Sequence, residues 1–473
     1  MIKRIEVNII LFYVALLVLS SLIIFHIYTI YAFPSLGPDS GFYLKTAYDL
    51  ANGLEFYNNF NNSYTPLAMY INSLPFYVFS NVSLELMFSF FLLIYLILSI
   101  LFYKISSLIN VNKKVNVFGT FLFISMLFLL EGVHILLEPY VLLFQFLAIY
   151  FLLKYKYSCI NLFLVGLFTF LSFYSKQYGL FIVPGVIFLL YVNSDSLNVF
   201  FRRTAYLFFG IIIPVCFLIT YFCFYKGLNM SEFLFQMIGI PALNGDQLIT
   251  NIGYTFKGLT SRLIGVFRIF PFVFLLILLI PFIKRKLLSR NIVFVIILFI
   301  SSLGVLLFAY YPHYFQLIIP YLILVIISVI KKIRTNVQFG VFLLFLIFLK
   351  GSYSMSMATF NYKKNTYKEQ QANLKILNRY LHSGERVYLQ AISPAYYFLC
   401  KYDSPNFGVL GYKFPIEITL KCMANSIMPG GYIIADKELE KNDEFKSFEL
   451  FSKVSLVKKK ILILKKKETD EER

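Results

Sequence analysis

The most constraining feature of this sequence is a series of apolar runs that recur along its first 350 residues. A helix needs roughly 20 predominantly apolar residues to cross the hydrocarbon core of a bilayer, and several of the runs approach that length. Hydrophobic residues make up 59% of the 473-residue chain and charged residues only 14%. A polytopic α-helical membrane protein is therefore expected.

Apolar runs bounded by charged or turn residues predict about eleven transmembrane helices. They cover residues 8–31, 84–103, 116–133, 139–153, 160–174, 178–192, 205–225, 270–283, 291–309, 314–330 and 337–350. The first run follows Lys3 and Arg4 as a signal peptide would, but it is long and no small-residue cleavage site closes it. We interpret it as an uncleaved span with a cytoplasmic N-terminus.

The distribution of basic residues supports this orientation. With the N-terminus in the cytoplasm, most Lys and Arg residues before residue 350 fall in cytoplasmic segments, as the positive-inside rule requires. The formal net charge of +19 is therefore interpreted as a topology signal, and no nucleic-acid partner is expected. An odd number of spans would place the C-terminal region outside the cytoplasm.

Three long segments are predicted to lie outside the membrane core. Residues 32–83 and 226–269 form outer loops, and residues 351–473 are expected to form a small extracytoplasmic α/β domain. In that domain, residues 368–382 have the pattern of an amphipathic helix, and strands are predicted at 386–390, 431–436 and within 453–467. The domain has no Gly-rich phosphate loop. An extracytoplasmic location would permit a disulfide between Cys400 and Cys422.

Asp39 lies in the stretch "PDSGFY", a few residues past the first predicted span. One interpretation is a solvated acid that caps a helix, because Asp-Ser-Gly before a helical stretch is common at helix N-termini. The other interpretation is a functional carboxylate at the membrane surface.

A second polar group occurs in "LLEGVHILLEPYVLL", where Glu131, His134 and Glu138 are spaced so that a continuous helix would place them on one face. Charged groups at membrane depth are costly unless they face water or a partner, so this pattern indicates a possible site. The alternative is a short polar hairpin that reaches the surface, and Pro139 favours a break there. One His and two Glu at this spacing match no specific metal motif.

Cations occur on the same predicted side of the membrane. Lys176 follows an apolar run in "FYSKQYG" and could either snorkel to the interface or hold a phosphate. His313 lies in the Tyr-rich stretch "YYPHYFQ", which could be an interfacial belt or a binding site for a lipid head group, sugar or phosphate. Arg262 and Arg268 add two cations. Together with the acids, these residues would enclose a polar cavity that opens to the outside.

In order and position, these segments resemble GT-C-fold glycosyltransferases, which use polyprenyl-phosphate sugars and include protein O-mannosyltransferases and aminoarabinose transferases of lipid A. The stretch "PDSGFYLKTAYDLANGLEF" resembles the first outer loop of that class, and "LLEPYVLLFQF" resembles its acid at the start of span 4. The stretches "FYSKQYGLFIVP" and "HYFQLIIPYL" resemble its Lys-containing turn and its late span. Two departures are Ser40, where many members carry a second acid, and His313, where related enzymes often have Arg.

The resemblance implies an inverting glycosyl transfer on the outer face of the membrane, with Asp39 as general base. Its implied partners are a polyprenyl-phosphate sugar donor, a glycan, lipid or protein acceptor, and membrane lipid. Acceptor or sugar positioning is expected from Glu138, Glu131, His134 and Tyr43, and donor phosphate binding from Lys176, His313, Arg262 and Arg268. No cofactor is required, although Asp39 and Glu138 could bind a divalent metal ion. The expected location is the bacterial inner (plasma) membrane.

Other functions compete with this interpretation. A transporter or flippase of lipid-linked glycans would also place charges within its spans, but it is expected to show internal repeats, and none is visible. A surface-glycan polymerase would be expected to carry a large basic outer loop, whereas the 226–269 loop is only modestly basic. A membrane scaffold without enzymatic activity would leave the polar clusters unexplained.

Overall fold

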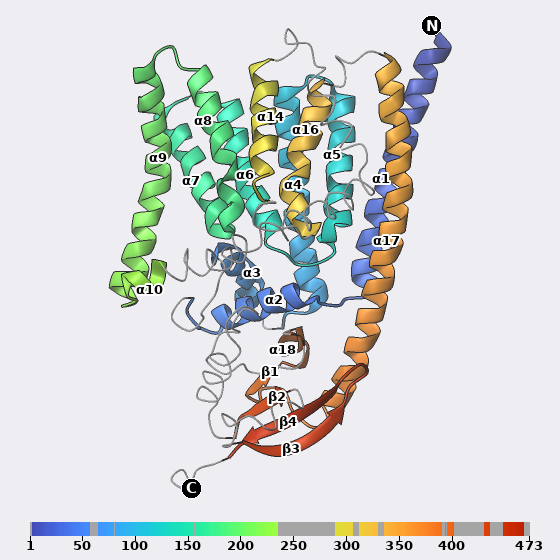
Figure 1. The fold of residues 1–473 in the computed structure, drawn as a ribbon, viewed down its shortest axis with the longest axis vertical. Helices are drawn as coiled ribbons and strands as arrows, with labels where there is room; N and C mark the ends of the chain where they lie inside the picture. The colour runs from blue at the N-terminus through green and yellow to red at the C-terminus, as the bar shows by residue number, and fades with distance from the viewer. Residues whose placement is uncertain are drawn as a thin grey trace, which may run out of the picture.

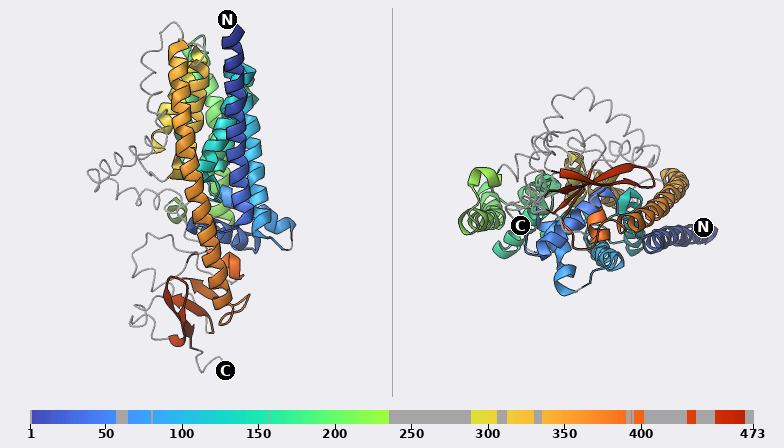
Figure 2. Two further views of the ribbon diagram at one scale, coloured as in Figure 1. Left: turned by 90° about the vertical axis from the view of Figure 1, so that its right-hand side faces the viewer. Right: turned by 90° about the horizontal axis from the view of Figure 1, so that it is seen from below.

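The computed structural model describes residues 2–56, 65–79, 81–155, 157–234, 289–305, 312–329, 335–389, 393, 395–401, 430–435 and 448–467. In this part of the chain, apolar helices stand side by side in a bundle, and a small mixed sheet lies beyond one end of it (Figure 1). The N-terminus is at the opposite end of the bundle from the sheet. The side view shows the same division (Figure 2).

The bundle consists of largely apolar helices, of which α17 is apolar in its first part and polar in its last. They are α1 (Ile2–Ala32), α4 (Leu84–Ile109), α5 (Lys113–Leu127) continued by η1 (Phe128–Gly132), α6 (Glu138–Lys154), α7 (Cys159–Ser175), η2 (Gln177–Ile182) with α8 (Val183–Val192), α9 (Leu197–Ile219) continued by η3 (Thr220–Tyr225), α14 (Arg290–Ser302), η7 (Pro312–Leu317) with α16 (Ile319–Val329), and α17 (Thr335–Leu377). A short helix, α10 (Met230–Leu234), follows η3.

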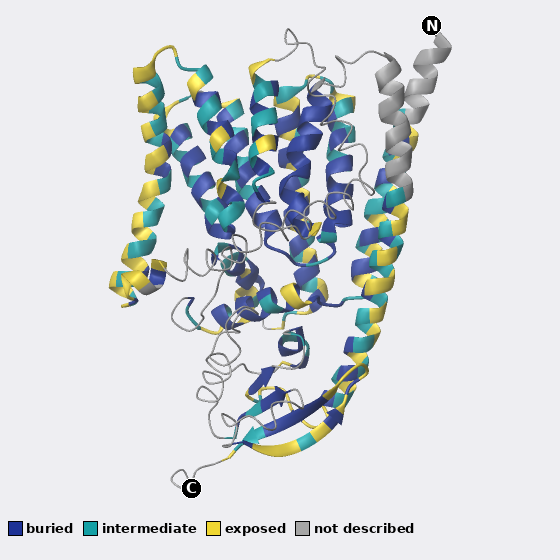
Figure 3. Ribbon diagram, in the orientation of Figure 1, coloured by how far each residue is buried: buried dark blue, intermediate teal, exposed yellow. Residues whose placement is uncertain are grey.

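The described helices include four that are long and apolar enough to cross a membrane, at 12–32, 84–109, 113–132 and 197–225. Shorter apolar helices pack among them, and the centre of the bundle is buried (Figure 3). Every predicted span other than 270–283 falls on a described helix, and that one lies outside the described residues. These features are those of a helical membrane protein.

Helix α9 shows how the edge of the bundle is built. It packs closely against α7 because both helices carry glycine at the contact: a Cβ on Gly166 would lie 2.0 Å from the Leu207 carbonyl oxygen, and one on Gly210 would lie 2.1 Å from that of Phe163. Small residues allow such close backbone approach between membrane helices. The opposite side of α9 exposes Phe208, Ile212 and other large apolar side chains, as expected for a surface that faces lipid.

Two short helices cover the end of the bundle that faces the sheet. Helices α2 (Pro38–Ala51) and α3 (Leu67–Val78) pack against each other there, and α18 (Ala395–Cys400) lies against α2 (Figure 1). Helix α2 begins with Pro at its N-terminus, where proline is favoured because its missing N–H is not needed. The first predicted outer loop, residues 32–83, therefore contains two helices in the structure.

Helix α17 joins the bundle to the sheet. It is a single helix of 43 residues that lies beside α1 within the bundle and continues past it (Figure 2). The predicted boundary between residues 350 and 351 falls inside it, and the separately predicted helix at 368–382 overlaps its last ten residues and extends five residues past its end. The membrane region and the C-terminal domain thus share one continuous element.

The C-terminal sheet has four strands in the order β1-β2-β4-β3, namely β1 (Val387–Leu389), β2 (Tyr432–Ala435), β4 (Lys460–Lys466) and β3 (Phe448–Ser455). Strands β1 and β2 are parallel, and the other pairs are antiparallel, with Ile434 opposite Ile463. One face packs on the end of α17 and on α18. All three strand predictions are confirmed, although β3 starts at Phe448, before the predicted 453. Cys422 lies outside the described residues, so the disulfide remains a prediction.

Candidate active site

The site begins where α5 loses its helical geometry. Its continuation η1 contains two residues outside the helical region, Leu130 and Glu131, and Glu131 has a φ of 65°. A positive φ is unfavourable for a residue with a Cβ and is often retained at functional sites. The continuous helix considered for Glu131, His134 and Glu138 does not exist, because the chain turns here and α6 starts only at Glu138.

The loop between η1 and α6 is tied to the start of α2. The Ile135 N–H donates a hydrogen bond to the Ser40 hydroxyl at 3.1 Å, which brings this loop beside Asp39. His134 is enclosed next to Gly37, and burial lowers the pKa of its imidazole well below the ordinary value. His134 is therefore neutral, and its Nδ1 has no hydrogen-bond partner among the described residues.

A buried ion pair lies at the start of α6. Lys176 Nζ is 2.6 Å from Glu138 Oε1, and the side chains are 3% and 0% exposed. The ammonium also lies 4.4 Å from the centre of the Tyr314 ring and 5.6 Å from that of Tyr178. A buried pair is stable only when such additional contacts compensate the loss of water. The second oxygen of Glu138, Oε2, has no hydrogen-bond partner among the described residues.

His313 connects the two acids of the predicted cluster. Its Nδ1 is 2.7 Å from Glu131 Oε2, and its Nε2 is 4.0 Å from Glu138 Oε1. The His313 ring belongs to η7 and the two acids to η1 and α6, so three separate elements meet at this point. The two glutamates therefore orient the imidazole from both sides.

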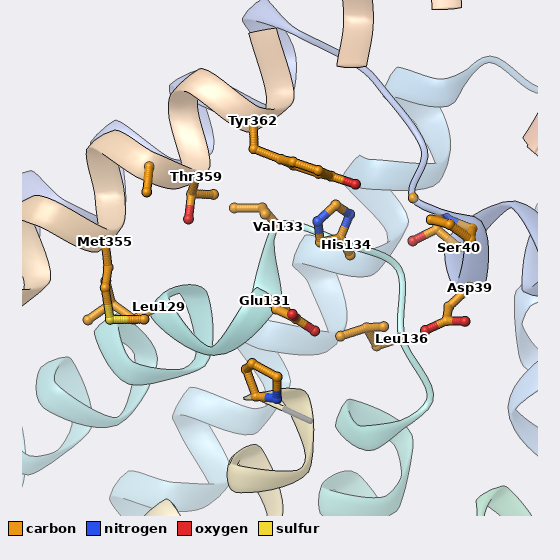
Figure 4. A pocket seen from close by; sticks show the side chains of 14 residues that line it. Asp39, Ser40, Leu129, Glu131, Val133, His134, Leu136, Met355, Thr359 and Tyr362 are labelled. Carbon is orange, nitrogen blue, oxygen red and sulfur yellow. The ribbon is translucent and has the colours of Figure 1, made fainter. Parts of the chain in front are cut away.

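These groups border a cavity of about 470 Å³, which is lined by Gly37, Pro38, Asp39, Ser40, Leu129, Glu131, Val133, His134, Leu136, Pro312, Met355, Ala358, Thr359 and Tyr362. The Asp39 and Glu131 carboxylates face it together with Tyr362 and Met355 of α17 (Figure 4). The volume lies within the range of small-molecule binding sites.

Asp39 has an unusual electrostatic environment. Its side chain is exposed to the cavity, yet the surrounding protein desolvates it enough to raise the pKa of its carboxyl above the usual value. The charges of His313 and Lys176 oppose this rise in pKa, and those of Glu138 and Glu131 add to it. A raised carboxyl pKa in a cavity is typical of a group that takes up a proton during a reaction.

The segment that carries Asp39 is held by polar side chains of α17. The Gln370 amide donates to the Leu36 carbonyl at 2.7 Å and accepts from the Leu36 N–H at 3.2 Å, and Lys363 Nζ donates to the Ser35 carbonyl at 2.6 Å. Seven residues before Lys363 on α17, Ser356 Oγ is 3.0 Å from His26 Nε2 on α1. These three α17 side chains are seven residues apart and therefore share one face of the helix.

The structure brings together most of the predicted site residues. Asp39, Glu131 and His134 line the cavity, whereas Glu138, Lys176 and His313 form a buried layer beside it. Tyr43 is 3% exposed within the apolar core and is not among the lining residues. Arg262 and Arg268 lie outside the described residues.

Several residues of the site were not predicted from the sequence. Ser40 was noted only as a departure from the GT-C pattern, in which many members carry a second acid. The α17 residues Thr359, Tyr362 and Gln370 were assigned to the C-terminal domain. The polar residues at 356, 363 and 370 recur every seven residues, and this recurrence could have indicated that one face of a single helix makes polar contacts. Within the described part of the chain, no group of three or more His, Cys, Asp and Glu side chains is placed to hold a metal ion. The divalent ion therefore remains a prediction.

Neither a protein-family model nor a curated protein sequence matches this chain. Its structure, however, is similar to the crystal structure of ArnT from Cupriavidus metallidurans bound to undecaprenyl phosphate, with a TM-score of 0.60 over 95% of this chain and 97% of ArnT. The apo structure of the same protein gives a TM-score of 0.51 over 98% and 97%. The chain has an ArnT-like fold.

ArnT is an aminoarabinose transferase and a GT-C glycosyltransferase, so the predicted GT-C-like fold is confirmed. The sequence identity to ArnT is 10% in both comparisons. At that level the likeness concerns the fold alone, because one fold can support different chemistries.

Proposed function

We propose that this protein is a membrane glycosyltransferase that moves a sugar from a polyprenyl-phosphate donor to an acceptor on the outer face of a bacterial plasma membrane. The observation that carries the proposal is the position of Asp39, whose carboxylate lines the cavity and has a raised pKa beside a cluster of acids and cations. The ArnT-like fold supports the donor class, since the ArnT structure holds undecaprenyl phosphate.

In the proposed reaction, Asp39 accepts the proton of the acceptor hydroxyl or amine as that group attacks the anomeric carbon. The bond between the anomeric carbon and the phosphate oxygen breaks, and the lipid phosphate leaves with the electron pair. A single displacement inverts the anomeric carbon. A phosphate is a stable anion, so the leaving group needs stabilisation by positive charge more than it needs a proton.

Lys176 and His313 supply this positive charge. Because Lys176 is paired with Glu138, the donor phosphate replaces Glu138 as the partner of the ammonium. Glu138 Oε1 then becomes available to accept hydrogen bonds from sugar hydroxyls, together with Oε2, which has no hydrogen-bond partner among the described residues. Glu131 holds His313 in position through its bond to Nδ1.

The test is transfer of a labelled sugar from a polyprenyl phosphate by the purified protein in lipid nanodiscs. Asp39→Asn should lower the rate about 10²- to 10⁴-fold, the usual contribution of a general base. Asp195→Asn is the matched control, because Asp195 is exposed in the turn between α8 and α9, outside the site. Transfer by Asp39→Asn at the wild-type rate would overturn the assignment of the base.

A further inference from the structure

A second cavity lies where the membrane region meets the C-terminal domain. It has a volume of about 350 Å³, and its walls come from α2, from the segment after α3, from the turn at residues 383 and 384, and from α18 with Lys401. Helix α18 lies against α2 on the side that faces the sheet (Figure 1). The mechanism proposed above uses none of these residues.

The walls of this second cavity are fixed relative to each other. A Cβ on Gly41 would lie 2.4 Å from the Ala395 backbone nitrogen, so α2 and α18 meet at a backbone contact that only glycine allows. On the other side, the Gly384 N–H donates to the Lys401 carbonyl at 2.9 Å. Lys401 has a φ of 55°, which is unfavourable for lysine and holds its side chain at the cavity.

Aromatic rings form a large part of the lining. Tyr48 and Phe79 are 37% and 49% exposed, which leaves ring surface open at the cavity. Behind them, Phe76 contacts Tyr48 and Phe398 in edge-to-face arrangements, with ring centres 5.7 and 6.1 Å apart. Such a row of rings offers flat apolar surfaces of the kind against which the C–H faces of a pyranose pack.

The polar lining complements these rings. The amides of Asn52 and Asn81 and the hydroxyl of Ser383 can donate and accept hydrogen bonds, as sugar hydroxyls require. Lys45 is buried and paired with Asp49, so that pair contributes no net charge. Lys401 is exposed and has no ion pair within the described residues. Among the lining residues that the structure describes, Lys401 is therefore a cation without a carboxylate partner.

We propose that this cavity binds a saccharide unit of the acceptor that carries an anionic group such as a carboxylate. The inference rests on the proposed transferase function and names its acceptor class. Helix α2 connects the two sites, because Asp39 lines the first cavity and Tyr48 the second, nine residues or about 14 Å farther along the helix. An oligosaccharide of a few units spans that distance, so one acceptor reaches both.

The test uses the full-length protein and two disaccharides that differ at one carbon: cellobiouronate, which carries a carboxylate, and cellobiose, which carries a hydroxymethyl group. Binding is measured by calorimetry. Phe79→Ala should weaken both disaccharides about tenfold, as expected for loss of an aromatic contact. Lys401→Asn removes the charge with a residue that tolerates a positive φ, and it should weaken only cellobiouronate, about fivefold. Lys375→Asn, at an exposed position on α17, should change neither affinity.

Several outcomes would overturn this inference. One is the absence of binding of either disaccharide to the wild-type protein at millimolar concentration, and another is unchanged binding to Phe79→Ala and Lys401→Asn. A third is displacement of cellobiouronate by glycerol phosphate with an affinity that Phe79→Ala does not alter, which would identify a lipid head-group site. Asp39→Asn should bind both disaccharides normally. If it also transfers sugar at the wild-type rate, the proposed function fails while the saccharide site stands.

Discussion

Replacement of Gln370 should lower the turnover number although Gln370 does not line the active-site cavity. Its amide makes two hydrogen bonds to the backbone of Leu36, three residues before Asp39. Leu36 is 1% exposed. Gln370→Leu would leave a buried N–H and a buried C=O without partners, at about 1–3 kcal/mol each. Water entering the linker, residues 33–37 between α1 and α2, would bring the total to about 2 kcal/mol, the low end of this range.

This cost should appear in catalysis, because the linker relaxes by moving Asp39 away from its place at the cavity. A loss of about 1.4 kcal/mol in transition-state stabilisation is a tenfold loss in rate, so kcat should fall at least about tenfold. The KM for the donor should change little, because Lys176 and His313, the proposed phosphate ligands, do not belong to the displaced segment. The pKa of Asp39, obtained from the acid side of the pH–rate profile, should also fall, because the carboxyl would be better solvated.

The assay is transfer from a short-chain polyprenyl-phosphate sugar, with kcat and KM determined across a range of pH. Gln370→Glu keeps the acceptor for the Leu36 N–H but loses the donor, so it should give an intermediate kcat. Gln371→Leu removes an exposed amide from the neighbouring position and serves as the control. A kcat for Gln370→Leu within twofold of the control, or a change confined to KM, would refute the positioning argument.

Five further outcomes are expected. Transfer should decline on acidification through the raised pKa of Asp39, at a higher pH than for an ordinary Asp. For the same reason, Asp39→Asn should be more stable to unfolding than the wild type at neutral pH, by less than about 1 kcal/mol, and should have no advantage in acid. Equal stability of the two proteins at both pH values would contradict this. Lys176→Met should lower the free energy of unfolding by about 3–5 kcal/mol, because it leaves Glu138 buried without its partner. The double variant Lys176→Met with Glu138→Leu should recover most of the lost stability. Losses that simply add in the double variant would count against the buried pair. Glu131→Gly should relieve the positive φ and raise stability by about 1 kcal/mol while it slows transfer, and faster thermal unfolding would speak against strain at this residue. Treatment with EDTA should leave transfer intact, because Lys176 and His313 supply the positive charge; loss of activity that a divalent ion restores would contradict the metal-free mechanism.

The sequence predicted the bundle well because apolar length and charge bias are properties of local segments. The ends of α7 fall within one residue of the predicted run at 160–174, whereas α4 ends six residues after its predicted run and α9 begins eight residues before its own. Strand β4 was also predictable from the sequence, because an apolar run between lysines is formed by Ile461, Leu462, Ile463 and Leu464.

The candidate site was harder to predict, since it depends on contacts between distant segments. The proximity of Asp39 to His134 rests on the bond from Ile135 to Ser40, and nothing local in the sequence indicates that pairing. Lys176 was interpreted either as a surface cation or as a free phosphate ligand. Its burial against Glu138 required the relative position of α6 and α7 to be known. The role of α17 was missed because a change in composition at residue 351 was taken as a domain boundary.

The uninterrupted α17 also constrains how this protein can vary. Its residues Ser356, Lys363 and Gln370 must keep the same rotational phase, because each contacts a different point along α1 or the linker after it. One inserted residue would rotate everything that follows by about 100° and advance it by about 1.5 Å. In this helix, only insertions or deletions of about seven residues keep the three side chains on the same face. Chimeras that exchange the C-terminal sheet should therefore be joined after Gln370.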